Sequence, residues 1–149
     1  ENIRLTESGN ATLLDLGFAH RPGENASFSE KGYVLGTVNY LAPELCGQEP
    51  KDDMRADIYS LGVTLFEMLT GQLPFPVGTP LETMHRHRTE DPQLLTDLIP
   101  DAPAAVTELI DAMMSRTPDD RPNAGKVLQR LIQCEIASLG RTQGLRLVA

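Results

Sequence analysis

Residues 57–71 read Asp57-Ile-Tyr-Ser-Leu-Gly-Val-Thr-Leu-Phe-Glu-Met-Leu-Thr-Gly71, and this stretch decides the fold. On a helix of about 3.6 residues per turn, its apolar residues cover nearly the whole circumference. Polar side chains form only one narrow stripe, through Ser60, Thr64 and Glu67. Such a pattern predicts a buried helix, with Asp57 as its N-cap and Gly71 just past its end. We therefore expect the rest of the chain to pack around this helix.

The composition is that of one globular domain, or of one lobe of a larger one. The net charge of −8 argues against non-specific nucleic-acid binding, which depends on neutralising phosphates. Cys46 and Cys134 match no metal-ligand spacing, so we expect two free thiols in a reducing cytoplasm. No signal peptide or transmembrane run is predicted. Because the chain begins at Glu1 without an initiator Met, we expect a fragment.

A β-hairpin is predicted at the start of the chain. Its strands would be residues 3–5 and 11–14, joined by the turn residues 7–10. In a register that pairs Leu5 with Thr12, Asn2 lies opposite Asp15. Two oxygen-bearing side chains would then meet at the open end of the hairpin.

The chain after the hairpin is predicted to be a long loop followed by a helical body. Residues 16–40 lack sustained periodicity, and their middle is an exposed loop. Helices are then expected to begin near Pro43, to span 80–88 and 103–114, and to follow Asn123, with fraying after Gly140. The two histidines of His85-Arg86-His87-Arg88 point about 200° apart on a helix, so they cannot share a metal ion. We interpret that segment as a solvated helix face.

Five motifs occur in a fixed order along the chain. They are Asn2, Asp15-Leu16-Gly17, Gly36-Thr37 with Tyr40 and Ala42-Pro43-Glu44, Asp57 with Gly62, and Arg121-Pro122. This ordered set resembles the catalytic domain of eukaryotic-like serine/threonine protein kinases. The resemblance implies a mainly α fold, the C-terminal lobe of a kinase. In it a small N-terminal β-hairpin and a long activation segment pack around a buried central helix. The lobe would span residues 1–140, with a tail at 141–149.

The resemblance implies that Asn2 and Asp15 bind Mg²⁺ and, through it, ATP. Mg²⁺ prefers hard oxygen ligands, which an amide and a carboxylate supply. Leu16 replaces the Phe usual in the D-F-G motif and keeps its apolar character. The catalytic Asp of H-R-D-x-x-x-x-N would lie five residues before Asn2, ahead of Glu1. No catalytic residue of that motif is therefore present in this chain, and Thr37 would only support the missing one.

Residues 16–44 resemble the activation segment of the family. Gly36 and Thr37 would shape the groove for the substrate, which implies Ser/Thr rather than Tyr specificity. Ser27 and Ser29 are candidate phosphosites, because phosphate can order such a loop against an arginine. The alternative is that these exposed serines are ordinary loop residues.

Three further residues are assigned structural roles by the resemblance. Glu44 and Arg121 would form a buried ion pair that joins the two halves of the lobe. Asp57 would accept backbone hydrogen bonds from the catalytic loop, a role compatible with an ordinary N-cap.

The implied function is ATP-dependent phosphorylation of protein substrates by a parent protein that also supplies the N-terminal lobe. This fragment alone is expected to be inactive. The alternative is a pseudokinase or scaffold that binds protein partners. A third possibility, an unrelated helical domain, predicts no contact between Glu44 and Arg121. The oligomeric state is left open.

Overall fold

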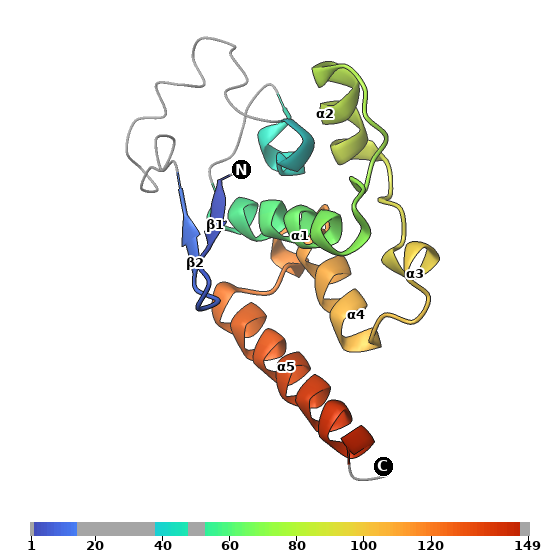
Figure 1. Ribbon diagram of the computed structural model, residues 1–149. Helices are drawn as coiled ribbons and strands as arrows, with labels where there is room; N and C mark the ends of the chain where they lie inside the picture. Colours follow the sequence, from blue (N-terminus) through green and yellow to red (C-terminus); the bar gives the residue numbers. More distant parts are fainter. Residues whose placement is uncertain (1, 15–37, 48–52, 147–149) are drawn as a thin grey trace.

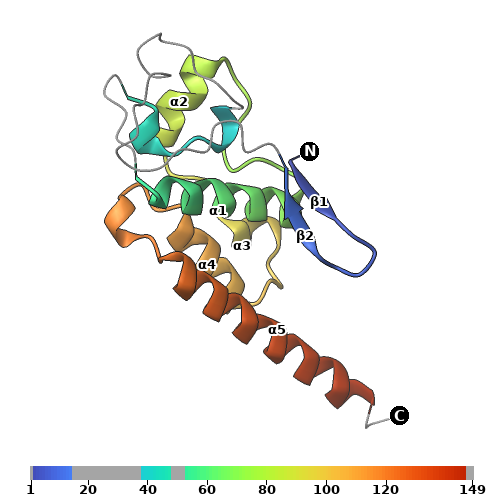
Figure 2. The same ribbon diagram turned by 90° about the vertical axis from the view of Figure 1, so that its left-hand side faces the viewer.

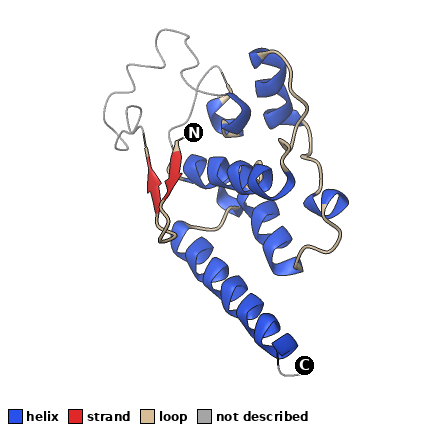
Figure 3. Ribbon diagram, viewed as in Figure 1, coloured by secondary structure: helices blue, strands red, loops and turns tan. Residues whose placement is uncertain are grey.

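The computed structural model describes residues 2–14, 38–47 and 53–146 (Figure 1). It is mainly helical with one small antiparallel sheet, which is the predicted fold class (Figure 3). The elements are β1 (Ile3–Leu5), β2 (Ala11–Leu13), the 3-10 helices η2 (Val38–Tyr40) and η3 (Pro43–Leu45), α1 (Arg55–Thr70), α2 (Pro80–Thr89), α3 (Leu95–Leu98), α4 (Ala104–Met113), the 3-10 helix η4 (Pro118–Asp120) and α5 (Ala124–Arg146). Helix α1 runs through the middle, with α2, η2 and η3 on one side and α4 and α5 on the other (Figures 1 and 2).

One face of α1 carries the core of the molecule. The buried residues of this helix are Ala56, Tyr59, Gly62, Val63 and Phe66. All of them except Gly62 form a single cluster with the buried residues Ala42, Leu95, Ile110 and Met114. The prediction of a central helix around which the chain packs is therefore confirmed for this face.

The opposite face of α1 differs from the prediction. Leu61 and Leu69 are exposed, and 65% of the Met68 surface is open to solvent. Apolarity around a full circumference thus does not guarantee burial around it. In the described part of the chain, η2, α3 and α4 pack against this helix and leave these three side chains exposed.

Of the two predicted ends of α1, only the C-terminal one is correct. Gly71 adopts a left-handed conformation (φ 71°) and donates its N–H to the carbonyl of Glu67 at 2.8 Å, as expected of a residue that ends a helix. The prediction of Asp57 as N-cap is wrong, because the helix begins at Arg55 and Asp57 lies in its first turn. Asp53 instead accepts the backbone N–H of Arg55 at 2.9 Å.

Helix α5 begins where the sequence predicts. The Asn123 side chain accepts the Lys126 backbone N–H at 2.9 Å, the hydrogen bond of an N-cap. Val127 is buried against Leu109 and Met113 of α4. The helix then continues past the expected end at residue 140 to Arg146 and extends away from the body (Figures 1 and 2).

The predicted hairpin is present, but its register is shifted by one residue. Leu5 pairs with Ala11 rather than with Thr12. The reason is the turn, in which Gly9 has a φ of 83° and donates its N–H to the Thr6 carbonyl at 2.9 Å. This three-residue loop with a left-handed Gly sets the pairing of the strands that it joins.

The shifted register changes the open end of the hairpin. The Leu14 backbone N–H donates to the Asn2 carbonyl at 2.8 Å, so Asn2 faces Leu14. The predicted pairing of Asn2 with Asp15 is therefore wrong by one position.

The other helices lie close to their predicted spans. Helix α2 ends one residue later than expected, and α4 is one residue shorter at each end. The short helices α3 and η2 had no periodic signal in the sequence and were not predicted.

Candidate functional site

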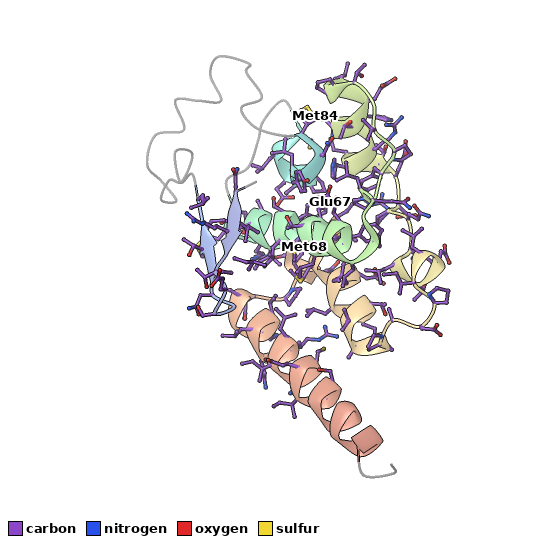
Figure 4. The ribbon with its side chains drawn as sticks, viewed as in Figure 1. Glu67, Met68 and Met84 are labelled. Carbon is purple, nitrogen blue, oxygen red and sulfur yellow. The ribbon has the colours of Figure 1, made fainter. Side chains whose placement is uncertain are left out.

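Residues 38–47 lie between α1 and α2 and follow directly after Gly36-Thr37 in the chain. The Tyr40 hydroxyl donates to the Glu67 carboxylate at 2.6 Å, and the Ser60 hydroxyl donates to the Tyr40 carbonyl at 2.8 Å. Glu67 lies on the side of α1 that faces this segment (Figure 4). The hydrogen bond to the Glu67 carboxylate, together with burial, raises the pKa of Tyr40 to about 12. Two side chains of α1 thus hold Tyr40, one through its hydroxyl and one through its carbonyl, just after the predicted substrate groove.

Arg121 and Glu44 form the ion pair that the resemblance implied. The two guanidinium Nη atoms donate to the two carboxylate oxygens at 2.6 and 2.7 Å, across 77 residues of chain. The Arg121 side chain is 0% exposed and that of Glu44 is 9% exposed. Bidentate geometry without solvent makes this a strongly directional contact. It joins η3 to the loop between η4 and α5, and it excludes the interpretation as an unrelated helical domain.

Backbone carbonyls use the remaining donors of Arg121. The Nε group donates to Ser115 at 2.8 Å, while the Nη groups also donate to Arg55 at 2.9 Å and to Arg116 at 3.4 Å. The guanidinium carbon lies 5.0 Å from the centre of the Tyr59 ring, in a cation–π contact. Three separate segments, namely η3, α1 and the turn after α4, therefore contact this one side chain.

The contacts of Tyr59 continue into α2, where they overturn one prediction. The Tyr59 hydroxyl and His87 Nδ1 are 2.7 Å apart in a buried hydrogen bond. His87 is fully buried and makes an edge contact with the Phe75 ring, with centroids 4.8 Å apart. The prediction of a solvated face for this segment is thus wrong for His87, whereas His85 and Arg88 are exposed as expected. No signal in the sequence indicated this burial, because His87 and Thr83, four residues before it, are both polar and yet both buried.

The protonation of His87 is set mainly by its surroundings. Burial lowers the pKa of His87, and the backbone of Asn39 offsets part of that effect. Its Nε2 atom has no hydrogen-bond partner among the described residues. The neutral imidazole is therefore the form that the folded protein favours.

The structure places some of the predicted site residues and leaves others outside its described ranges. Asn2 is exposed at the open end of the hairpin, and Asp57 is exposed in the first turn of α1. The remaining predictions concern Asp15, Ser27, Ser29, Gly36 and Thr37, which all lie outside the described residues.

The described residues contain no group of three or more His, Cys, Asp or Glu side chains that could hold a metal ion. Cys46 and Cys134 are both free thiols, as predicted. Across residues 2–14, 38–47 and 53–146, no helix is long and apolar enough to cross a membrane.

Residues 1–131 match the protein kinase domain family. The match covers most of the chain and includes the anchored segment, α1 and the Glu44–Arg121 pair. This chain therefore belongs to the protein kinase domain family.

The curated relatives make the class more specific. The chain is 34% identical over 121 residues to the serine/threonine-protein kinase PknL of Mycobacterium tuberculosis, covering 81% of this chain and 30% of that protein. It is 32% identical over 125 residues to the "Probable serine/threonine-protein kinase PknB" of Corynebacterium glutamicum, covering 80% of this chain and 19% of that protein. The chain thus spans less than a third of the length of these relatives. These two relatives are named serine/threonine protein kinases, a class of transferases that act on protein substrates.

Proposed function

We propose that the protein containing this chain transfers the γ-phosphoryl group of ATP to Ser or Thr hydroxyls of protein substrates, with Mg²⁺ as cofactor. The observation that carries the proposal is the anchoring of residues 38–47. Tyr40 is held by Glu67 and Ser60, and Glu44 is held by Arg121. A segment fixed at these two points would support the residues just before it, Gly36 and Thr37.

The donor set of Asn2 and Asp15 fits the proposed cofactor. Mg²⁺ is bound in proteins by one or two carboxylates and other hard oxygen donors, together with phosphate oxygens. Asn2 is exposed at the end of the hairpin and faces Leu14, the residue before Asp15. When bound, the ion would neutralise charge on the phosphates of ATP.

The other roles in the proposal belong to the segment before Tyr40. Thr37 would hydrogen-bond the catalytic Asp of the H-R-D motif, and Gly36 with Thr37 would form the floor of the substrate groove. This pair favours Ser/Thr hydroxyls over Tyr. Ser27 and Ser29 would be the sites at which phosphorylation activates the enzyme.

The proposal also concerns the activity of the isolated chain, its partners and its location in the cell. Because the position of the motif's catalytic Asp falls before Glu1, the 149-residue chain alone would not transfer phosphate. The acidic net charge of −8 favours protein over nucleic-acid partners, and the two free thiols favour a cytoplasmic location.

The test is phosphate transfer by the full-length protein from radiolabelled ATP and Mg²⁺ to a generic substrate such as casein. We expect Asp15→Asn to lower incorporation about a hundredfold or more, because a ligand of the metal is lost. Asp101→Asn, an exposed carboxylate between α3 and α4, serves as the control and should leave activity unchanged.

Phosphoamino-acid analysis of the labelled substrate should show phosphoserine or phosphothreonine. Phosphotyrosine would contradict the assignment of Gly36 and Thr37. No incorporation by the wild-type full-length protein would favour the alternative, a pseudokinase or scaffold. Phosphate transfer by the isolated 149-residue chain would contradict its proposed inactivity.

A further inference from the structure

A cavity of about 450 Å³ lies beside α2. It is lined by Cys46, Leu81, Glu82, Met84, His85, Arg86, Arg88 and Glu90. Apart from Cys46, which follows η3, these residues belong to α2 or follow it directly. The cavity therefore lies between one helix and the end of the anchored segment.

Uncharged groups form the floor of the cavity. Cys46 is 6% exposed, and its thiol is 3.3 Å from the Ala42 carbonyl, to which it donates. Burial raises the pKa of the Cys46 thiol to about 11, so the thiol is neutral at pH 7. Met84 lies on the side of α2 that faces residues 38–47 (Figure 4), and Leu81 at the edge is 78% exposed. A large apolar side chain would find an apolar surface there.

Most charged groups on the rim already have partners. Glu82 accepts the backbone N–H of Thr79 at 2.8 Å in the capping box of α2. Arg86 donates to the Pro76 carbonyl at 2.8 Å and lies 3.9 Å from Glu90. These contacts hold the rim in one arrangement before anything binds.

Arg88 is the exception among the charged side chains of the rim. It is exposed and forms no ion pair or hydrogen bond within the described part of the chain. It is close enough to Cys46 to act against the rise in the thiol pKa. The cavity thus combines an apolar floor with a cation that is unpaired among the described residues, on a chain whose net charge is −8.

We infer that this cavity docks a segment of a partner protein in which a large aliphatic or aromatic residue lies close to a Glu or Asp. The apolar residue would fill the space over Cys46 and Met84, and the carboxylate would pair with Arg88. An exposed apolar anchor beside a rim of fixed polar groups is the usual anatomy of a protein-binding site. Docking here uses no residue of the proposed phosphoryl transfer, so it stands or falls independently of that function.

The test is selection of peptides from a random eight-residue display library on the immobilised 149-residue chain. The selected peptides are then measured by fluorescence anisotropy. We expect enrichment of sequences that combine a large apolar residue with Glu or Asp. Arg88→Glu should weaken their binding about tenfold, because one charge pair becomes a repulsion. Replacing the peptide's acidic residue by Lys should restore binding to Arg88→Glu.

Arg130→Glu on α5 is the matched control, because it makes the same charge change far from the cavity lining. It should leave the peptide affinity unchanged. Urea unfolding of Arg88→Glu should match the wild type, since Arg88 has no ion-pair partner among the described residues. Peptides that bind wild type and Arg88→Glu equally, or a selection without acidic enrichment, would overturn the inference.

Discussion

Arg121 uses all five guanidinium N–H groups within the protein, on the Glu44 carboxylate and on three backbone carbonyls. A lysine has three donors and no planar fork, so it could not reproduce this set. The pair is buried, and removing either partner would leave the other charge without compensation.

Glu44→Ala should therefore lower the free energy of unfolding by about 3–5 kcal/mol. The control is Arg55→Ala, which breaks an exposed ion pair with Asp119. That change should cost at most about 1 kcal/mol. Urea denaturation of the two variants beside the wild type measures both values. Equal losses for the two variants would refute the structural role of Glu44.

A second prediction concerns the buried imidazole of His87. Because its pKa is lowered in the folded state, the unfolded chain binds a proton first as the pH falls. This residue's contribution to stability is therefore complete above the ordinary His pKa of about 6.5 and is lost as the pH drops towards the folded value. The wild type should be less stable at about pH 5.5 than at about pH 7.5.

Urea midpoints of wild type, His87→Gln and His85→Gln at the two pH values separate the sources of this effect. His87→Gln should reduce the difference between the urea midpoints at the two pH values. His85→Gln, which changes an exposed residue, should leave that difference as in the wild type. A wild-type slope that survives in His87→Gln would assign the effect to another group.

At the scale of elements, the sequence predicted the type of each long helix and missed what depends on neighbours. Asn123 as N-cap and Gly71 as terminator were correct, because both act through local backbone geometry. The exposure of Met68 and the burial of His87 were missed, since the same helical periodicity fits a covered or an open face. Only tertiary packing decides between them.

The predictions for the candidate site were likewise partly correct and partly wrong. The Glu44–Arg121 contact was expected from motif residues far apart in the chain, and the structure contains it. The hairpin register was wrong by one residue, because a three-residue loop and a four-residue loop contain the same turn-forming amino acids. The bonds of Tyr40 to Glu67 and of Tyr59 to His87 were not foreseen, because both join separate elements.

The contact between α1 and α4 gives a third prediction. A Cβ atom at Gly62 would lie 3.0 Å from Met113 Cβ and 3.0 Å from Met114 Cγ. Gly62→Ala should therefore destabilise the protein by about 1–3 kcal/mol, although alanine favours helix by about 1 kcal/mol.

Gly125→Ala in α5 is the matched control, since its nearest neighbour is the Asn123 side chain at 3.4 Å. We expect no loss of stability from Gly125→Ala. Thermal or urea unfolding of the two variants reads out the difference. A Gly62→Ala protein as stable as wild type would show that α4 can move away without cost.

At the scale of the whole molecule, apolar side chains remain on the outside of α5. Leu128, Ile132 and Ile136 are exposed at helical spacing, while Val127 beside them is buried. Only the first part of the helix packs on α4 (Figure 2). The described body therefore leaves a continuous apolar stripe along this helix.

Changing the stripe to glutamine at its three positions should alter the free energy of unfolding by no more than about 0.5 kcal/mol per site. Binding of an apolar dye such as anilinonaphthalene sulfonate should fall, because exposed apolar area is removed. Val127→Gln is the control on the same helix and should unfold the chain at lower urea, since it buries an amide. A triple variant as unstable as Val127→Gln would mean that the stripe is packed in solution.

The ion pair of Glu44 with Arg121 also has a consequence for the order of folding. Its partners are 77 residues apart, so the chain must close a long loop before the contact forms. We expect the contact to form after the rate-limiting step. In stopped-flow experiments, Glu44→Ala should leave the refolding rate nearly unchanged. A loss of about 3 kcal/mol in the free energy of unfolding would then raise the unfolding rate about 150-fold. The ion pair would then form late in folding and, by slowing unfolding, would set the lifetime of the native state.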